Sequence, residues 1–273
     1  MTYSGVLVQF IGPPLTVLAL WALFDGRRGR VTGGGLRAQW AWRVLAAHVA
    51  LALLYTTPWD NYLVATGVWW YEPALVTGVT LGYVPLEEYV FFVVQTLMVG
   101  LWLLTLSRVI FVAPVQSEAS GRVRAWATGV TGGVWLAAVA LLLTGWRPGT
   151  YLGLELAWGL VPLMIQFAFG ADILWRRRGL LLATFLPAAL YLCAVDAIAI
   201  RSGTWTIDPQ QSIGLLIAGV LPVEEVIFFS LTTALVVCGM TLMLAPESLP
   251  RAQAWWKAAL APWRRRRAYH DCP

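Results

Sequence analysis

The chain has 273 residues, of which 59% are hydrophobic and 12% are charged, and its mean hydropathy is +0.69. This composition excludes an ordinary soluble domain and favours a polytopic membrane protein with a single membrane body. Basic residues that flank apolar runs and contact anionic headgroups explain the net charge of +5, which therefore requires no nucleic-acid partner.

Seven apolar runs are long enough to cross a bilayer, which takes about 20 residues each. They lie near residues 5–24, 38–57, 84–107, 124–143, 154–174, 180–200 and 221–244. The first run follows only Met1 to Ser4, without a basic segment before it or a small-residue cleavage site after it. We therefore expect a retained helix and not a signal peptide. The predicted fold is an all-α polytopic membrane protein with seven transmembrane helices.

The distribution of basic residues predicts the orientation of these helices. All but two of the 19 Lys and Arg residues fall on one side of the membrane if the seven runs cross it in turn. They lie within residues 27–43, 108–124, 176–178 and 251–267, whereas Arg147 and Arg201 fall on the opposite side. Because basic loops tend to stay in the cytoplasm, we expect a multi-pass protein of the cell membrane with its N-terminus outside and its C-terminus in the cytoplasm.

Two of the apolar runs begin with a pair of adjacent acids. The string Pro-x-Glu-Glu-x-x-Phe-Phe occurs at residues 85–92 and again at residues 222–229, and its acids are Glu87, Glu88, Glu224 and Glu225. Proline in the first helical turn places both acids of each pair at a helix start. A single Glu there is most often a complement to the helix dipole. Two adjacent acids that recur with the same neighbours indicate a functional site, because a carboxylate within a membrane span is costly.

The acid pairs belong to a longer internal repeat. Along the sequence, Asp60 precedes Glu87 by nearly the same number of residues as Asp196 precedes Glu224. Earlier in each unit, Pro14-Leu15 resembles Pro162-Leu163. Between each Asp and the Glu that follows it, a further segment is shared: residues 66–69 match residues 202–205. Each unit has three spans, and the run at 124–143 lies between the units, so the prediction is 3+1+3 parallel internal repeats. The expected division is 1–107 for the first three-helix repeat, 108–153 for a cytoplasmic loop and linking helix, 154–244 for the second repeat and 245–273 for a basic cytoplasmic tail.

Aromatic rings accompany each acid pair. A carboxyl group in apolar surroundings favours its neutral form and can act as a Brønsted acid, and the face of an aromatic ring stabilises a developing cation. These are the ingredients for protonating an alkene and protecting the carbocation that follows. The candidate substrate-binding rings, for which lipid-facing or core packing is the alternative, are Phe91, Phe92, Phe228 and Phe229.

The remaining polar residues give weaker signals. Asp60 and Asp196 lie at the outer ends of their spans, next to loops at 58–83 and 201–212 that contain turn signals such as Thr57-Pro58 and Asp208-Pro209. Both are candidate catalytic groups, with an N-cap, turn or surface role as the alternative. His48 and His270 are isolated, and Cys193, Cys238 and Cys272 form no spacing motif, so neither a metal site nor a disulfide is expected. The many Trp residues, such as Trp69-Trp70, are interpreted as interfacial anchors.

The duplicated Pro-x-Glu-Glu motif in a repeated three-span unit resembles the flavin-independent lycopene cyclases. In that family the lycopene cyclase domain occurs as two small membrane subunits in some bacteria and as a fused pair in others. The resemblance covers nearly the whole chain to about residue 244, and this chain is similar to the fused form, with both acids retained in both halves.

The resemblance implies cyclisation of the acyclic ends of lycopene to β-ionone rings, giving γ-carotene and then β-carotene without net redox change. Such an enzyme is an intramolecular lyase of the isomerase class, and other enzymes of the carotenoid pathway are candidate partners. By analogy with the family, Glu87 and Glu224 are placed first as catalytic groups, with Glu88 and Glu225 as partners that tune or relay the proton. No dinucleotide-binding fingerprint follows a strand, so no flavin or other cofactor is expected.

Several alternatives stay open at this point. A seven-helix 3+1+3 sugar transporter shares the repeat plan, although its path would need polar residues in several spans. A carotenoid hydratase, or a cyclase that makes a different ring, would use the same acid chemistry. A retinal protein is excluded because the only lysine, Lys257, lies in the basic tail. A prenyltransferase is disfavoured because the chain has no Asp-rich motif for Mg²⁺.

Overall fold

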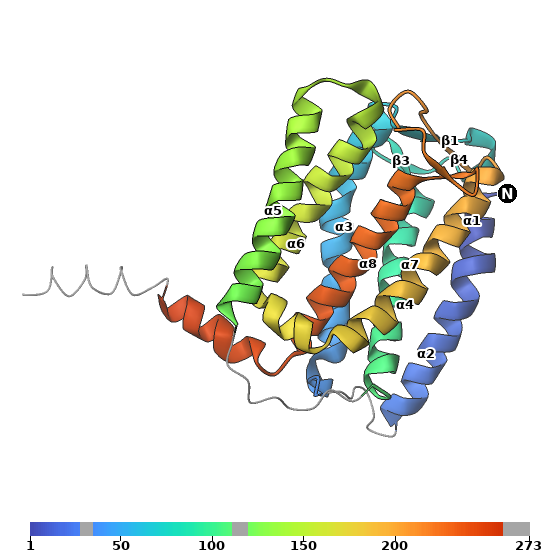
Figure 1. The fold of residues 1–273 in the computed structure, drawn as a ribbon. Coiled ribbons are helices and arrows are strands. Elements are labelled where there is room, and N and C mark those ends of the chain that lie inside the picture. The colour runs from blue at the N-terminus through green and yellow to red at the C-terminus, as the bar shows by residue number, and fades with distance from the viewer. Residues whose placement is uncertain (28–34, 111–119, 259–273) are drawn as a thin grey trace, which may run out of the picture.

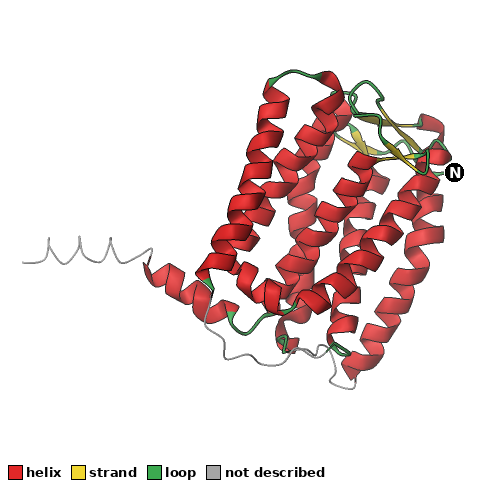
Figure 2. Ribbon diagram, viewed as in Figure 1, coloured by secondary structure: helices red, strands yellow, loops and turns green. Residues whose placement is uncertain are grey.

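The computed structural model describes residues 1–27, 35–110 and 120–258, which form a mostly helical bundle (Figure 1; Figure 2). Its labelled α-helices are α1 Tyr3–Val6, α2 Gly12–Arg27, α3 Ala41–Ala65, α4 Leu86–Ser107, α5 Gly121–Leu143, α6 Thr150–Arg176, α7 Arg178–Arg201 and α8 Val223–Leu244. A further helical stretch at residues 248–258 follows α8. A π-helical turn over Leu7–Ile11 joins α1 to α2, and short 3-10 turns cover Ala38–Trp40, Pro73–Leu75 and Arg147–Gly149. Residues named above that lie outside the described part are Arg28, Arg30, Arg264 to Arg267, His270 and Cys272.

Within the described ranges, six helical segments are long and apolar enough to cross a membrane: Tyr3–Arg27, Leu86–Ser107, Gly121–Leu143, Arg147–Arg176, Arg178–Arg201 and Val223–Leu244. They correspond to six of the seven predicted runs. The other predicted run, near 38–57, falls in α3, whose C-terminal half contains polar residues such as Thr56, Asp60 and Asn61 that lower its mean hydropathy. The fold is that of a helical, membrane-embedded protein, and the seventh span stays a prediction.

The sequence placed a turn at Thr57-Pro58, but α3 continues through it to Ala65 with Pro58 inside the helix. A proline within a helix removes one main-chain hydrogen bond, and here the helix is retained. The side chain of Asn61 donates back to the carbonyl of Thr57 over 2.9 Å. The consequence for the site is that Asp60 lies on a helix and not in a loop.

The helices that begin with the acid pairs occupy the centre of the bundle. Pro85 and Pro222 are the extended residues immediately before α4 and α8, and each first turn contains both acids, as predicted. α4 and α8 contact each other, and α2, α3, α6 and α7 surround them. α5 packs on α6 at the edge of the bundle (Figure 1). Both acid pairs therefore begin at the same end of the two central helices.

Three two-stranded antiparallel ribbons lie at this end of the bundle (Figure 2). β1 (Trp69–Tyr71) pairs with β4 (Trp205–Ile207), β2 (Thr80–Leu81) with β3 (Val84–Pro85), and β5 (Leu216–Ile217) with β6 (Leu221–Pro222). Turn signals in these loops were predicted, whereas the strands were not, since strands of two or three residues show no alternating pattern. The β1–β4 ribbon joins the two loops that the sequence repeat had aligned.

Two helix prolines produce matching contacts in the two halves of the chain. Pro14 has no N–H to donate to the carbonyl of Phe10, and this carbonyl instead accepts a hydrogen bond from the hydroxyl of Tyr191 over 2.5 Å. In the second half, Pro162 leaves the carbonyl of Trp158 free, and the hydroxyl of Tyr55 donates to it over 2.9 Å. Each proline thus lets a Tyr from the other half of the chain tie two helices together.

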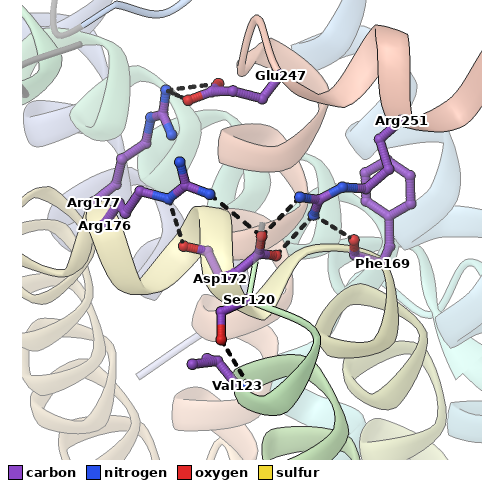
Figure 3. A network of polar contacts seen from close by, with 8 residues as sticks. All are labelled: Ser120, Val123, Phe169, Asp172, Arg176, Arg177, Glu247 and Arg251. Atoms are coloured by element: carbon purple, nitrogen blue, oxygen red, sulfur yellow. Dashed lines mark hydrogen bonds and ion pairs between the residues drawn. The ribbon is translucent and has the colours of Figure 1, made fainter. Parts of the chain in front are cut away.

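A charged network holds the opposite end of the bundle (Figure 3). Arg251, which follows α8, donates to both carboxylate oxygens of Asp172 on α6 over 2.7 Å. Arg176 contacts the same carboxylate at 3.3 Å, and Arg177 donates to Glu247 over 3.0 Å. The network fixes the segment after α8 against α6, far along the helices from the acid pairs.

Candidate active site

A cavity lies where the first turns of α4 and α8 meet the β1–β4 ribbon. Most of its lining is apolar or aromatic, and it also contains four carboxyl groups, from Asp60, Glu88, Asp196 and Glu225. In the described part of the chain, no Lys, Arg or His lines it. We call this space the acid cavity.

Glu88 lies in the acid cavity between two phenols. The hydroxyl of Tyr3 donates to its Oε2 over 2.5 Å, and the hydroxyl of Tyr71 donates to the same atom over 3.0 Å. Tyr71 belongs to β1, and burial, followed by the nearby carboxyls of Asp60 and Glu88, raises its pKa well above the usual range for tyrosine. Tyr71 therefore stays protonated and remains a hydrogen-bond donor.

Glu225 has the corresponding position in the second half of the chain. The hydroxyl of Tyr151, at the start of α6, donates to Glu225 Oε1 over 2.6 Å. Asp196 on α7 is close enough to Glu225 to interact with it, and it accepts a 2.9 Å hydrogen bond from Nε1 of Trp205. The second half thus provides a carboxyl pair and a phenol donor on one wall of the cavity.

Asp60 completes the group of four carboxyls. Its side chain is only 1% exposed and lies beside the indole of Trp69. It interacts electrostatically with Glu88, which in turn interacts with Glu225. Asp60 and Asp196 are therefore buried cavity residues, and the surface role considered from the sequence does not apply to either.

Glu87 and Glu224 point away from the acid cavity. Glu87 accepts hydrogen bonds from the N–H of Thr77 over 2.6 Å and from its hydroxyl over 3.0 Å. Glu224 accepts one from the N–H of Ile213 over 2.7 Å. Each of these acids holds the loop that precedes its own helix, and neither lines the cavity.

All four phenylalanines proposed from the sequence line the acid cavity: Phe91, Phe92, Phe228 and Phe229. Phe91 and Phe229 meet edge to face with 6.1 Å between ring centroids. Phe228 is stacked on Trp59 at 5.7 Å. The cavity thus places aromatic rings beside the carboxyl groups of Glu88 and Glu225.

Several cavity residues were not identified from the sequence. Trp69 was interpreted as an interfacial anchor, but it is buried in the cavity wall, and Trp59, Tyr71 and Trp205 also line the cavity. Tyr3 and Tyr151 stand at the same distance before Pro14 and Pro162, so the repeat alignment contained a signal for both.

A further buried acid, Glu155, lies on α6 one turn after Tyr151. It is fully buried, and both of its carboxyl oxygens lack a hydrogen-bond partner within the described ranges. Glu155 interacts electrostatically with Glu225 and Glu224, although it is not part of the cavity lining. No sequence motif distinguished it.

A family model for lycopene cyclase matches the chain over residues 34–106 and 148–243, and each matched stretch contains one acid pair. The chain belongs to the lycopene cyclase family. The lycopene beta-cyclase of Halobacterium salinarum is 38% identical over 245 residues, which cover 88% of this chain and 95% of that protein. Membership of the lycopene cyclase family does not favour the sugar-transporter alternative.

Two fungal members of the family are longer proteins named bifunctional lycopene cyclase/phytoene synthase. The protein of Podospora anserina is 34% identical over 203 residues, which cover 71% of this chain and 34% of the fungal protein. The protein of Pyrenophora tritici-repentis is 35% identical over 252 residues, which cover 82% of this chain and 41% of the fungal protein. No solved structure matches the chain.

Proposed function

We propose that this chain is a lycopene cyclase that converts the acyclic ends of lycopene to β-ionone rings, as an intramolecular lyase of the isomerase class. The observation that carries the proposal is the placement of Glu88 and Glu225 in one aromatic cavity, each with a tyrosine donor on its carboxyl group. The family, with its lycopene beta-cyclase of Halobacterium salinarum, supplies the substrate class.

The four carboxyls of the acid cavity supply the proton. Four neighbouring carboxyl groups, with no cationic side chain among the described residues of the lining, cannot all be ionised together. Part of the group is therefore protonated and available as a general acid. A protonated carboxyl adds its proton to the terminal double bond, which gives a tertiary cation. The neighbouring double bond attacks this cation and closes the ring, and a carboxylate then removes a proton, so that no net proton or electron is consumed.

The hydrogen bonds suggest different roles for the two glutamates. Two phenol donors on one oxygen of Glu88 stabilise a negative charge there, which suits the group that accepts the final proton. Glu225 has one phenol donor and an adjacent carboxyl, Asp196, with which a proton can be shared. We assign Glu225 as the acid and Glu88 as the base. The proposed catalytic groups are therefore Glu225 and Glu88. Glu87 and Glu224 instead position the loops that precede their helices.

The aromatic lining protects the cation. Rings of Trp59, Phe91, Phe228 and Phe229 line the cavity, and an aromatic face attracts a cation within about 6 Å of its centroid. The mostly apolar wall also excludes water, which would otherwise capture the cation and give a hydrated product. This wall favours a cyclase over a hydratase.

For the membrane arrangement, we propose seven spans as 3+1+3 parallel repeats, with α3 as the second span and α5 between the repeats. The repeat units are residues 1–107 and 154–244, with a linking segment at 108–153 and a basic tail at 245–273. Two pairs of equivalent hydrogen bonds support the repeat. The bond from Tyr3 to Glu88 matches that from Tyr151 to Glu225, and the bond from Tyr191 to the Phe10 carbonyl matches that from Tyr55 to the Trp158 carbonyl. The bias of basic residues supports an N-terminus outside the cell and a C-terminus in the cytoplasm.

Other carotenoid-pathway enzymes are proposed partners, because two fungal relatives are named for a cyclase and a phytoene synthase in one protein.

The function is tested by expression in a lycopene-accumulating host with pigment analysis. We expect the wild type to convert lycopene to β-carotene and Glu225→Gln to leave lycopene unchanged. Glu72→Gln removes an exposed carboxyl from a loop at the same end of the bundle and should behave as the wild type. Lycopene that persists with the wild type, or a product with an added hydroxyl, would contradict the proposal.

A further inference from the structure

Two apolar grooves lie on the bundle in addition to the acid cavity. The first, here called the α3–α6 groove, is lined by α3, α4, α6 and α8. The second, the α2–α7 groove, is lined by α2, α4 and α7. No function has been assigned above to either groove.

The two grooves occupy equivalent positions in the proposed repeat. In the α3–α6 groove, Pro162 and Ile165 on α6 face Tyr55 on α3. The corresponding α2–α7 residues are Pro14, Val17 and Tyr191. The grooves are therefore two versions of one site, and their differences can be compared position by position.

Of the two grooves, the α3–α6 groove borders the acid cavity. Phe92 and Phe228 line both the groove and the cavity, so the two spaces are adjacent across these rings. Trp158 in the groove is stacked at 4.3 Å on Trp59 in the cavity, which makes the aromatic wall continuous. Among the described residues, none that lines the α2–α7 groove also lines the cavity.

One pair of equivalent positions differs strongly in the size of its side chain. Trp102 on α4 lines the α2–α7 groove, and the corresponding residue on α8 is Gly239. A Cβ atom added at Gly239 would lie 2.5 Å from His48 Nε2 and 3.0 Å from Gln166 Nε2, both of which belong to lining residues of the α3–α6 groove. The glycine therefore leaves space for these side chains where the first half of the chain has an indole ring.

Three of the polar side chains in the α3–α6 groove, Gln95, Gln166 and His48, make hydrogen bonds within the protein. Nε2 of Gln95 donates to Thr232 Oγ1 over 2.9 Å, Nε2 of Gln166 donates to the carbonyl of Leu235 over 3.0 Å, and Nδ1 of His48 is 2.8 Å from the carbonyl of Val44. Most of the lining is aliphatic or aromatic. The groove is consequently suited to a long hydrocarbon and not to a hydrophilic solute.

The mouth of the groove faces outward from the bundle. Leu51 on α3 and Ile165 on α6 line it, and they are 56% and 66% exposed. Exposed aliphatic side chains on helices that cross a membrane face lipid tails. A hydrophobic molecule dissolved in the bilayer can therefore reach the groove from the side.

We propose that the α3–α6 groove binds the polyene chain of the substrate while the end group of the same molecule lies in the acid cavity. This inference rests on the proposed function, because a C40 polyene whose end reaches Glu225 must place the rest of its chain in a continuous apolar space. The groove adjoins the cavity, has an apolar lining and opens to lipid. The α2–α7 groove takes no part in this binding.

The test fills each groove after the protein has folded. Ile165→Cys and Val17→Cys are matched variants, because the two residues occupy equivalent positions and are 66% and 60% exposed. Each purified variant is treated with a bulky aromatic maleimide, incorporation is checked by mass, and the conversion of lycopene is measured in lipid vesicles. Wild type treated with the same reagent controls for its own cysteines, and the untreated variants control for the substitutions.

We expect labelled Ile165→Cys to lose about tenfold or more in kcat/KM, because the chain contacts supply binding energy that the label removes. Each labelled variant is compared with its own untreated form, and labelled Val17→Cys should match untreated Val17→Cys. Full activity of labelled Ile165→Cys, or an equal loss in labelled Val17→Cys, would overturn the inference while leaving the cyclase function standing. Failure of the untreated wild type to convert lycopene would instead remove the proposed function and the inference with it.

Discussion

The hydroxyl of Tyr151 donates a 2.6 Å hydrogen bond to Oε1 of Glu225 inside the acid cavity. This donor fixes the carboxyl group of the assigned acid and stabilises its charged form after the proton has left. Tyr3 makes the equivalent contact to Glu88 in the first half of the chain. The two phenols lie at the starts of α6 and α1, so each half of the chain orients its own glutamate from a helix that does not carry the acid motif.

The first prediction follows from this contact. Tyr151→Phe removes the donor and keeps the ring, and a hydrogen bond to a charged group is worth about 1.5–3 kcal/mol. We therefore expect kcat for lycopene conversion to fall by roughly tenfold to a hundredfold, with little change in KM. Tyr83→Phe is the matched control, because Tyr83 is 66% exposed. Equal rates for Tyr151→Phe and the wild type would exclude a role for the phenol.

The second prediction separates the acid from the base. Glu225→Gln should abolish conversion, because no proton reaches the alkene. Glu88→Gln should still form the cation but lose its designated proton acceptor, so pigment analysis should show a low yield with rings whose double bond is in another position. Both variants are compared at equal amounts of folded protein. Normal β-rings from Glu88→Gln would contradict the assignment of Glu88 as the base.

The third prediction concerns the acids that hold the loops. Glu87→Gln weakens the charge-assisted hydrogen bonds to Thr77, so the thermal stability should fall by the equivalent of about 1–3 kcal/mol, and amide exchange should rise in residues 72–85. Thr77→Val removes the hydroxyl that donates to Glu87 and should therefore reproduce part of this loss of stability. Activity per folded molecule should stay within about tenfold of the wild type. An inactive Glu87→Gln of unchanged stability would restore the order of glutamates inferred from the sequence.

The positions of the acids were predictable because proline and an apolar run together define a helix start, and α4 and α8 begin where the sequence indicated. Which acid of each pair faces the cavity was not predictable. Adjacent residues on a helix point about 100° apart, and the direction of the bundle centre depends on packing by α3, α6 and α7. Glu88 and Glu225 face inward for that reason, whereas Glu87 and Glu224 face the loops.

The aromatic and phenolic parts of the site were harder to infer. Tryptophan near a span end is usually an interfacial anchor, and only the β1–β4 pairing brings Trp69 and Trp205 over the cavity. Tyr3 is two residues from the chain start, where local sequence contains no periodic signal. Asp60 was placed near a loop because Pro58 indicated a turn, and tertiary packing retained the helix instead.

The fourth prediction tests the network at the opposite end of the bundle (Figure 3). Asp172→Asn leaves Arg251 without a carboxylate partner in a site where Asp172 is 2% exposed, and breaking a buried ion pair costs about 3–5 kcal/mol. The melting temperature, followed by tryptophan fluorescence in detergent, should therefore fall by several degrees. Conversion of lycopene per folded molecule should stay unchanged, because the acid cavity lies at the other end of α4 and α8. Arg201→Gln, at an exposed helix end, is the control and should melt as the wild type does. Loss of activity without loss of stability in Asp172→Asn would mean that this network communicates with the cavity and does not merely fix the segment after α8.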